Sequence, residues 1–389
     1  MRRINKIFFI FVVSVSTFCF YPYIASARDY LVFFGTHSVG PGKGFSVAHF
    51  NSTTGELSKP QLIEVAQAPA YFIIHPNGRF LYTCNSNDFA KGYTGQTITA
   101  YKIDPGTGQL TFINQQSSGG ADPSFIFMDA SEKYLLVANY KGGSIASVET
   151  NPDGSLGKVV ANIFHSGRSV DTLRQTQPYA HSVRLDPSNR FALVADLGVD
   201  RLFVYRFDSA NGMLSPNNPP YVSVTPGSGP RHTAFHPNGR FLYLVNEMSS
   251  TVTTYQWDPS SGKLTELQIS STLPAGYSGK NACAEIEVSH NGKFLYASNR
   301  GHESIAVFSV NRKSGKISLV ENVPSLGHSP RNFTFDPTGK WFVVTNHLSN
   351  NAVVYKVNKR NGHLTPAGEP VTVDSPFCVR FLPIKLLAR

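Results

Sequence analysis

The chain has 389 residues, of which 41% are hydrophobic, 12% aromatic and only 15% charged, with 32 glycines and 25 prolines. The low charge content excludes a highly charged disordered chain, the many turn formers exclude a coiled coil, and both favour a β-rich globular protein. The formal net charge of +10 is not gathered into a run of Lys and Arg, so it indicates an anionic ligand and no nucleic-acid partner.

Residues 1–27 have the three parts of an export signal. A basic start precedes an apolar stretch from Phe8 to Ile24, and Ala25-Ser26-Ala27 is a typical A-x-A cleavage site. The alternative is an uncleaved anchor, against which Pro22 argues. No other stretch has the length of a membrane span. We therefore expect an exported protein, periplasmic or secreted, whose mature chain 28–389 is one domain without membrane contact.

Three cysteines remain after cleavage, namely Cys84, Cys283 and Cys378. An odd number leaves at least one thiol free, and no two of them form a CxxC pair, so the sequence predicts no disulfide framework.

An internal repeat decides the architecture. The segment HPNGRFLY occurs at His75–Tyr82 and again at His236–Tyr243, and looser copies recur at intervals of 47 to 57 residues. This period is typical of the blades of a propeller. The aromatic residue of the six copies is Phe80, Tyr134, Phe191, Phe241, Phe294 or Trp341.

Each copy predicts four strands in the same order. A short first strand, for example 71–74, leads into a tight turn with Pro and Gly, and a very apolar second strand begins at the repeated aromatic. An alternating third strand and a Gly-bearing turn lead to the fourth. The second strands are FLYTCN, YLLVAN, FALVAD, FLYLVN, FLYASN and WFVVTN.

The seventh blade is divided between the two ends of the chain. Segments 31–35 and 45–50 supply its later strands, and segment 377–382 matches the first strand of the other blades. Pairing of the two ends removes the free sheet edges. The predicted fold is thus all-β, a seven-bladed β-propeller closed by N- and C-terminal strands that share one blade.

Comparison of the blades with one another separates shared residues from unique ones. An Asn ends most second strands, and we expect it to hold the following turn. The unusual polar residues lie where first strands start or second strands end, and these two places share one face of a propeller. They are His181, Arg231, His232, Glu285 and Arg331 at the starts, and Asp196, Glu247, Arg300 and His347 at the ends.

These residues predict a basic rim around the channel mouth, suited to a carboxylate or a phosphate. The alternatives are structural ion pairs of the arginines with Glu285 or Asp196, and a buried structural imidazole at His181. A divalent cation held by Asp196, Glu247 and Glu285 is a further alternative, but the arginines compete for those carboxylates. No metal or cofactor is expected. The motifs of zinc peptidases, serine hydrolases and nucleotide-binding loops are absent from the sequence.

Seven segments in one order carry a family resemblance: Gln177–Val183, Ala195–Asp200, Gly229–His232, Val245–Glu247, Ala284–Glu285, Ser298–His302 and Ser329–Phe333. They resemble the seven-bladed β-propeller lactonases, the propeller type of 6-phosphogluconolactonase, which also includes fungal carboxymuconate-lactonizing enzymes. The resemblance covers essentially the whole mature chain. It implies an active centre of His181, Arg231, Glu247 and Arg300. The chain departs from the family at Tyr179, where a His is common, and in its export signal.

The resemblance implies hydrolysis of a small anionic sugar-acid lactone. We expect the protein to be a monomer or weak dimer. Glu247 or His181 would activate water, and Arg231 or Arg300 would stabilise the oxyanion. Further substrate contacts are expected from Arg331, His232, Asp196, Glu285, Tyr179 and His347. The alternatives are lactonisation of a muconate-like diacid, and a non-catalytic exported propeller that binds an anionic ligand or a partner protein.

Overall fold

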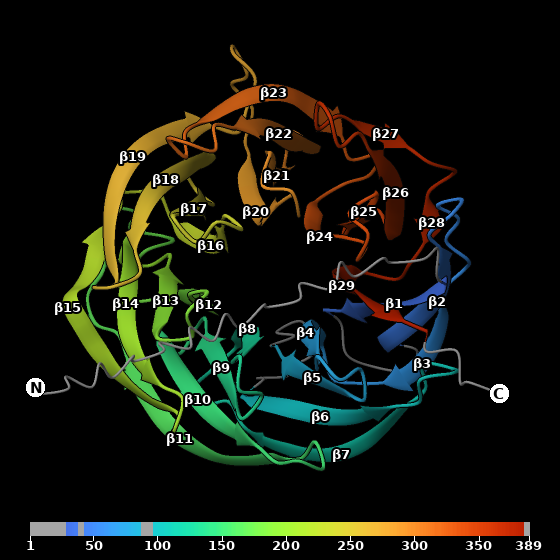
Figure 1. Ribbon diagram of the computed structural model, residues 1–389, viewed down its shortest axis with the longest axis horizontal. Coiled ribbons are helices and arrows are strands. Elements are labelled where there is room, and N and C mark those ends of the chain that lie inside the picture. The colour runs from blue at the N-terminus through green and yellow to red at the C-terminus, as the bar shows by residue number, and fades with distance from the viewer. Residues whose placement is uncertain (1–28, 38–42, 87–95, 385–389) are drawn as a thin grey trace, which may run out of the picture.

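Seven antiparallel sheets surround a central axis in the computed structural model (Figure 1), which describes residues 29–37, 43–86 and 96–384. The predicted all-β propeller is thereby confirmed. The predicted export signal, 1–27, lies outside the described residues. Among the residues described, no helix has the length and apolar character needed to cross a membrane.

The six blades that are continuous in sequence run from the innermost strand outward. They are β4 Pro69–Ile74, β5 Phe80–Asn85, β6 Thr97–Ile103 and β7 Leu110–Ser117; β8 Pro123–Met128, β9 Tyr134–Asn139, β10 Ser144–Thr150 and β11 Leu156–Phe164; β12 Ala180–Leu185, β13 Phe191–Asp196, β14 Arg201–Asp208 and β15 Met213–Ser223; β16 Pro230–Phe235, β17 Phe241–Asn246, β18 Thr251–Asp258 and β19 Lys263–Ser271; β20 Ala282–Val288, β21 Phe294–Arg300, β22 Ser304–Val310 and β23 Ile317–Pro324; and β24 Pro330–Phe335, β25 Trp341–Asn346, β26 Asn351–Val357, β27 Leu364–Pro366 and β28 Val371–Thr372.

The closing blade is built from both ends of the chain, as the sequence predicts. Its strands, from the axis outward, are β29 Pro376–Pro383, β1 Asp29–Thr36, β2 Gly44–Asn51 and β3 Gln61–Val65. The C-terminal strand pairs antiparallel with the N-terminal one, for example Leu31 with Leu382. Figure 1 shows this join as a red strand beside a blue one.

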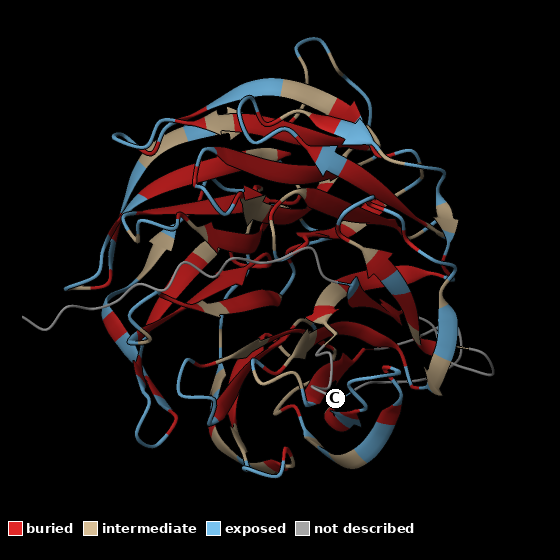
Figure 2. Cartoon of the chain, turned by 45° about the vertical axis from the view of Figure 1, so that its right-hand side comes forward, coloured by how far each residue is buried: buried red, intermediate tan, exposed pale blue. Residues whose placement is uncertain are grey.

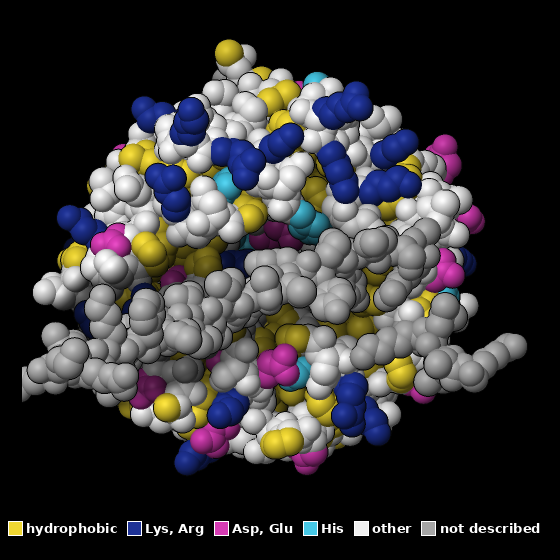
Figure 3. Space-filling model, viewed as in Figure 1, with side chains coloured by type: hydrophobic (Ala, Val, Ile, Leu, Met, Phe, Trp, Pro, Cys, Tyr) yellow, Lys and Arg dark blue, Asp and Glu magenta, His cyan; other side chains and the backbone are white. Residues whose placement is uncertain are grey.

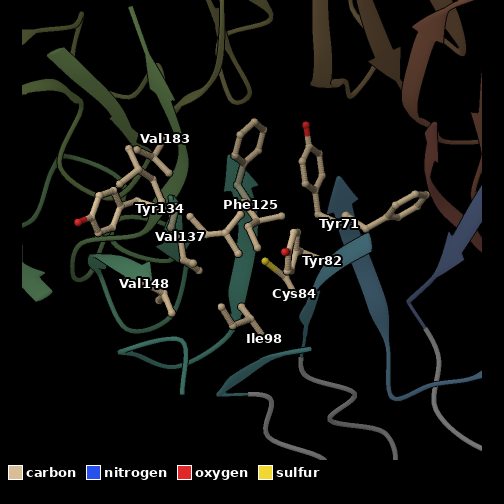
Figure 4. Close-up of a cluster of buried hydrophobic side chains, with 14 of the residues drawn as sticks. Tyr71, Tyr82, Cys84, Ile98, Phe125, Tyr134, Val137, Val148 and Val183 are labelled. Carbon is tan, nitrogen blue, oxygen red and sulfur yellow. The ribbon is translucent and has the colours of Figure 1, made fainter. Parts of the chain in front are cut away.

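Hydrophobic burial explains why the second strand of each blade is so apolar. In all six repeats this strand starts at the predicted aromatic, and its six residues from that aromatic onward are buried. Figure 2 shows buried inner strands and exposed turns and outer strands. Between neighbouring blades the core is aromatic: the Tyr71 and Phe125 rings stack with centroids 4.3 Å apart (Figure 4). Cys84, Cys283 and Cys378 are all buried and free.

The repeated Asn at the end of the second strand is buried and ties strands together. Its amide donates to hydroxyl groups at the start of the third strand, as from Asn85 to Thr97 and Thr99, or to the preceding connection, as from Asn346 to the carbonyl of Ser325. We expected this Asn to hold the following turn. Its hydrogen-bond partners in fact lie in the third strand and in the preceding connection.

A register shift lies at the start of the innermost strand in every blade. The shift falls, for example, between Pro69 and Tyr71 and between Pro230 and His232. A bulge leaves one residue unpaired and redirects its side chain. Because all seven shifts occur on the same face, they turn one side chain per blade toward the axis.

Candidate active site

A cavity of about 400 Å³ lies at the channel mouth, on the face where the innermost strands begin. The residues at or next to the register shifts line much of it, including His181, Arg231, Glu285 and Arg331. Second-strand ends supply Glu247 and Arg300. The structure therefore brings together the predicted catalytic residues and three of the predicted substrate contacts, which are Arg331, His232 and Glu285.

The centre of the cavity is the Glu247 carboxylate, which is held by three arginines. Oε2 accepts from Arg231 Nε at 3.0 Å and lies 2.9 Å from Arg300 Nη2, while Oε1 accepts from Arg174 Nη2 at 2.8 Å. The Glu247 side chain is only 8% exposed. Burial alone would raise its pKa, but Arg300, Arg231 and His181 together hold the pKa well below its usual range. Glu247 is therefore an anion throughout the neutral range.

Backbone contacts fix two of these arginines in place. Arg231 Nη1 donates to the carbonyl of Ala284 at 2.7 Å, and Arg300 Nη2 donates to the carbonyl of Cys283 at 2.7 Å. Arg231 is 2% exposed. Such anchored guanidinium groups are preorganised to stabilise negative charge without rearrangement.

His181 lies beside this cluster as a neutral imidazole. Its Nε2 is 4.0 Å from Glu247 Oε2, and its Nδ1 is buried without a hydrogen-bond partner. Burial lowers the pKa of His181 well below 6.5, and the charge of Arg231 lowers it further. The ring of Tyr140 packs edge-on against the imidazole, with centroids 5.2 Å apart.

A second imidazole is tied to a second carboxylate deeper in the site. His232 Nδ1 lies 2.9 Å from Glu285 Oε1, and the other Glu285 oxygen accepts from the amide of Asn332. Burial lowers the pKa of His232 to about 4. Burial of Glu285 would raise the pKa of its carboxyl group, but the contact with His232 lowers this pKa to about 2. At neutral pH His232 is thus uncharged.

Arg331 differs from the other three arginines that line the cavity because it makes no ion pair within 4 Å in the described part of the chain. Its guanidinium carbon lies 3.9 Å from the centre of the Phe377 ring, and His37 stacks on the same ring. Burial and the charges of Arg231 and Arg300 lower the pKa of Arg331. Because burial and neighbouring positive charges disfavour the charged form of this guanidinium, an anion bound beside it would stabilise it.

Three predicted substrate contacts lie outside the residues that line the cavity. Asp196 is fully buried and accepts from His165 and from the backbone NH groups of Tyr179 and Gly198. The Tyr179 ring packs on Tyr140, which does line the cavity. His347 packs against Phe377 and contacts Ser375. Asp196 holds the backbone at Tyr179 and Gly198, while Tyr179 and His347 pack against Tyr140 and Phe377, which line the cavity.

Eleven of the eighteen lining residues were not found by sequence reasoning, among them Tyr71, Tyr140, Arg174, Asn332 and Phe377. Blade alignment offered a signal for Phe377, because it begins the first strand of its blade as Arg331 does. Arg174 had no such signal, since it belongs to the connection 165–179, which the other blades do not repeat.

The carboxylates proposed for a cation do not converge. Asp196 faces His165, Glu247 faces arginines, and Glu285 faces His232. Within the ranges that the structure describes, no three His, Cys, Asp or Glu residues form a group that could hold a metal ion.

Comparison with known proteins agrees with this architecture. The family described as "Lactonase, 7-bladed beta-propeller" matches residues 31–381. A 6-phosphogluconolactonase of Bacillus subtilis is 34% identical over 353 residues, 91% of this chain and 98% of the relative, and one of Formosa agariphila is 33% identical over 86% of this chain and 94% of the relative. The structure of a periplasmic gluconolactonase of Pseudomonas aeruginosa, PpgL, superposes with a TM-score of 0.85 at 32% identity, covering 92% of this chain and 99% of that one.

These relatives confirm the predicted enzyme class, a lactone hydrolase. The identity, the near-complete coverage of both chains and the shared closed ring all point the same way. The chain belongs to the seven-bladed β-propeller lactonase family.

Proposed function

We propose that the protein hydrolyses a sugar-acid lactone in the arginine-rich cavity at the channel mouth. The observation that carries the proposal is the neutral imidazole of His181 beside the carboxylate of Glu247, within a ring of arginines. The names of the relatives, 6-phosphogluconolactonase and periplasmic gluconolactonase, support an aldonolactone as the substrate class.

His181 is the better candidate for the general base. Glu247 has both oxygens on guanidinium groups and a low pKa, so it is a poor proton acceptor. The neutral His181 would take a proton from water as the water oxygen bonds to the lactone carbonyl carbon. The resulting imidazolium is stabilised by Glu247. A positioned base of this kind contributes about 10²- to 10⁴-fold.

The arginines would stabilise the negative charge that forms on the carbonyl oxygen. Arg231 or Arg300 would bind this oxyanion, and one well-placed donor is worth roughly 3 kcal/mol in the transition state. The intermediate collapses by breaking the bond between the carbonyl carbon and the ring oxygen, and the imidazolium returns its proton to that oxygen. The product is the open hydroxy acid.

The anionic substituent of the substrate is assigned to Arg331, which, unlike the cavity arginines Arg174, Arg231 and Arg300, has no carboxylate partner within 4 Å in the described residues. His232 is neutral, so its proposed part is to orient the substrate and Arg231, whose Nη1 lies 3.2 Å from its Nε2. The predicted export signal supports an extracytoplasmic substrate, as does the periplasmic relative.

The test measures ring opening of 6-phosphogluconolactone and glucono-1,5-lactone above the spontaneous rate, with purified chain 28–389. We expect Glu247→Gln and Arg231→Ala to lose at least about 100-fold in kcat/KM. The matched controls are the exposed Glu266→Gln and Arg240→Ala, which should retain wild-type rates. A folded wild-type protein that accelerates neither lactone would overturn the proposal, and tight binding of either acid would then favour a non-catalytic receptor.

A further inference from the structure

One arginine of the cavity differs from the others in its exposure and in its origin. The Arg174 side chain is 47% exposed, whereas those of Arg231 and Arg300 are 3% and 16% exposed. It belongs to the connection between β11 and β12, so it reaches Glu247 from a loop above the cavity and not from the strands of the propeller wall.

The backbone that carries Arg174 is fixed. The Asp171 carboxylate accepts from the NH groups of Leu173 and Arg174, both at 2.8 Å. The Gln175 side chain is fully buried, where it donates to the carbonyl of Leu197 and accepts from the NH of Asp171. Because the turn is held on both sides of Arg174, only the side-chain torsions of this residue are free to change its contacts.

Arg174 contacts both Glu247 and the hydroxyl of Tyr140, and its contact with Glu247 is exchangeable. Its Nη2 donates to Glu247 Oε1, while Oε2 keeps Arg231 and Arg300. The Arg174 side of this pair is 47% exposed although the carboxylate is buried, so water already competes for the guanidinium. A phosphate or carboxylate entering the cavity would compete directly with Glu247 for this guanidinium, whereas a neutral lactone would not.

Transfer of Arg174 from Glu247 to a bound anion would also change the proton affinity of His181, the proposed base. His181 Nε2 lies 4.0 Å from Glu247 Oε2, so its proton affinity depends on how much of the negative charge of Glu247 is cancelled. Removal of one arginine from Glu247 leaves a stronger negative field at the imidazole, which raises the proton affinity of His181. Anion binding and base strength are then coupled through one side chain.

We propose that Arg174 is a specificity-determining and positioning residue that leaves Glu247 for the anionic group of the substrate, selecting phosphorylated or otherwise acidic lactones and strengthening His181 as it moves. This inference rests on the proposed function and deepens it. Arg331 supplies the fixed part of the anion site, and Arg174 supplies the part that responds to the charge of the substrate.

The experiment compares Arg174→Ala with the wild type on a charged and a neutral lactone. With 6-phosphogluconolactone we expect kcat/KM to fall about 10- to 100-fold, the usual effect of losing one hydrogen bond to a charged group. With glucono-1,5-lactone, which carries no anionic group, we expect a clearly smaller loss, so that the preference for the phosphorylated lactone falls. Arg174→Lys should keep part of the preference, and Arg168→Ala is the matched control because it removes an exposed arginine from the same loop.

A second readout separates this role from a merely structural one. In Arg174→Ala the acid limb of kcat/KM for glucono-1,5-lactone should move to higher pH, because His181 gains proton affinity, and Arg168→Ala should leave it in place. Equal losses on both lactones, or an acid limb that does not move, would overturn the proposal.

Calorimetric binding of 6-phosphogluconate and gluconate keeps the failure of this inference distinct from failure of the proposed function. If wild-type protein opens neither lactone but Arg174→Ala still weakens 6-phosphogluconate binding selectively, the anion role of Arg174 stands without the hydrolysis. If binding of the two acids is weakened equally or not at all, the inference fails even in an active enzyme.

Discussion

At the scale of single residues, the candidate site holds ionisable groups in unusual protonation states. Glu247 stays charged although buried, because guanidinium groups surround it, and His181 stays neutral because burial and neighbouring cations disfavour its protonation. The proposed mechanism therefore divides the two roles that the sequence left open between Glu247 and His181. The carboxylate holds charge in place, and the imidazole is free to accept a proton.

The first prediction concerns the pH dependence of the rate. In the proposed mechanism the active form of His181 is neutral, and its pKa lies well below 6.5, so protonation should remove activity only at pH values below 6.5. We expect kcat/KM, corrected for spontaneous opening, to stay level from pH 8 to pH 6.5. A half-maximal value near pH 6.5, as for an ordinary histidine, would contradict the assignment.

The second prediction concerns stability. His232 has a pKa of about 4 in the folded protein, so between pH 6.5 and pH 4 the unfolded chain binds the extra proton. Stability must therefore fall as the pH falls through this window, by roughly 3 kcal/mol for this residue. Urea unfolding at several pH values should show the decline, and His232→Asn should show a shallower one. If the free energy of unfolding of the variant falls with pH as steeply as that of the wild type, the lowered pKa assigned to His232 is wrong.

At the scale of the elements, each blade depends on the turn between its first two strands. In the last continuous blade Asp336 is fully buried, and its Oδ1 accepts from the backbone NH groups of Lys340 and Trp341 at 2.9 and 2.7 Å. The carboxylate thus satisfies donors that would otherwise be buried without partners, and it begins the strand at the repeated aromatic.

We therefore expect Asp336→Ala to destabilise the protein by about 2–3 kcal/mol, because it leaves backbone NH groups without a hydrogen-bond acceptor. Asp258→Ala, in an exposed turn between third and fourth strands, should have a clearly smaller effect. The measurement is the free energy of unfolding in urea, with activity of the folded fraction as a check that the site is intact. Equal effects of the two substitutions would show that the buried carboxylate has no special part.

At the scale of the whole molecule, the ring is closed by a strand from the far end of the chain. β29 pairs with β1 along its length and carries Phe377, the ring beneath Arg331. Closure thus joins the stability of the propeller to the geometry of the proposed anion site, since one strand serves both.

Deletion of residues 376–389 should therefore lower the unfolding temperature strongly and abolish lactone opening. Addition of a synthetic peptide of the same sequence should restore part of both, because the strand can dock on the exposed edge of β1. A peptide with the same residues in scrambled order is the control. A truncated protein as stable as the wild type would show that closure through β29 is dispensable.

The fold was open to sequence reasoning because it repeats. A blade period, a buried second strand that starts at each aromatic, and the split closing blade are local patterns, and the structure has each of them where it was expected. The set of residues on the site face followed from the same pattern, since strand direction alone decides which strand ends share a face.

Which of those residues touch one another was decided only in three dimensions. The register shifts at the starts of the innermost strands aim His181, Arg231 and Arg331 into the cavity, while Asp196, which stands where Asn246 does in the next blade, turns away to His165. Arg174 enters from a connection that no other blade repeats. The sequence by itself determined the ring and its polar face, because periodic burial is a local property. Tertiary structure alone decided the protonation states and the charge pairing, because both depend on burial and on distances between side chains that different blades and loops supply.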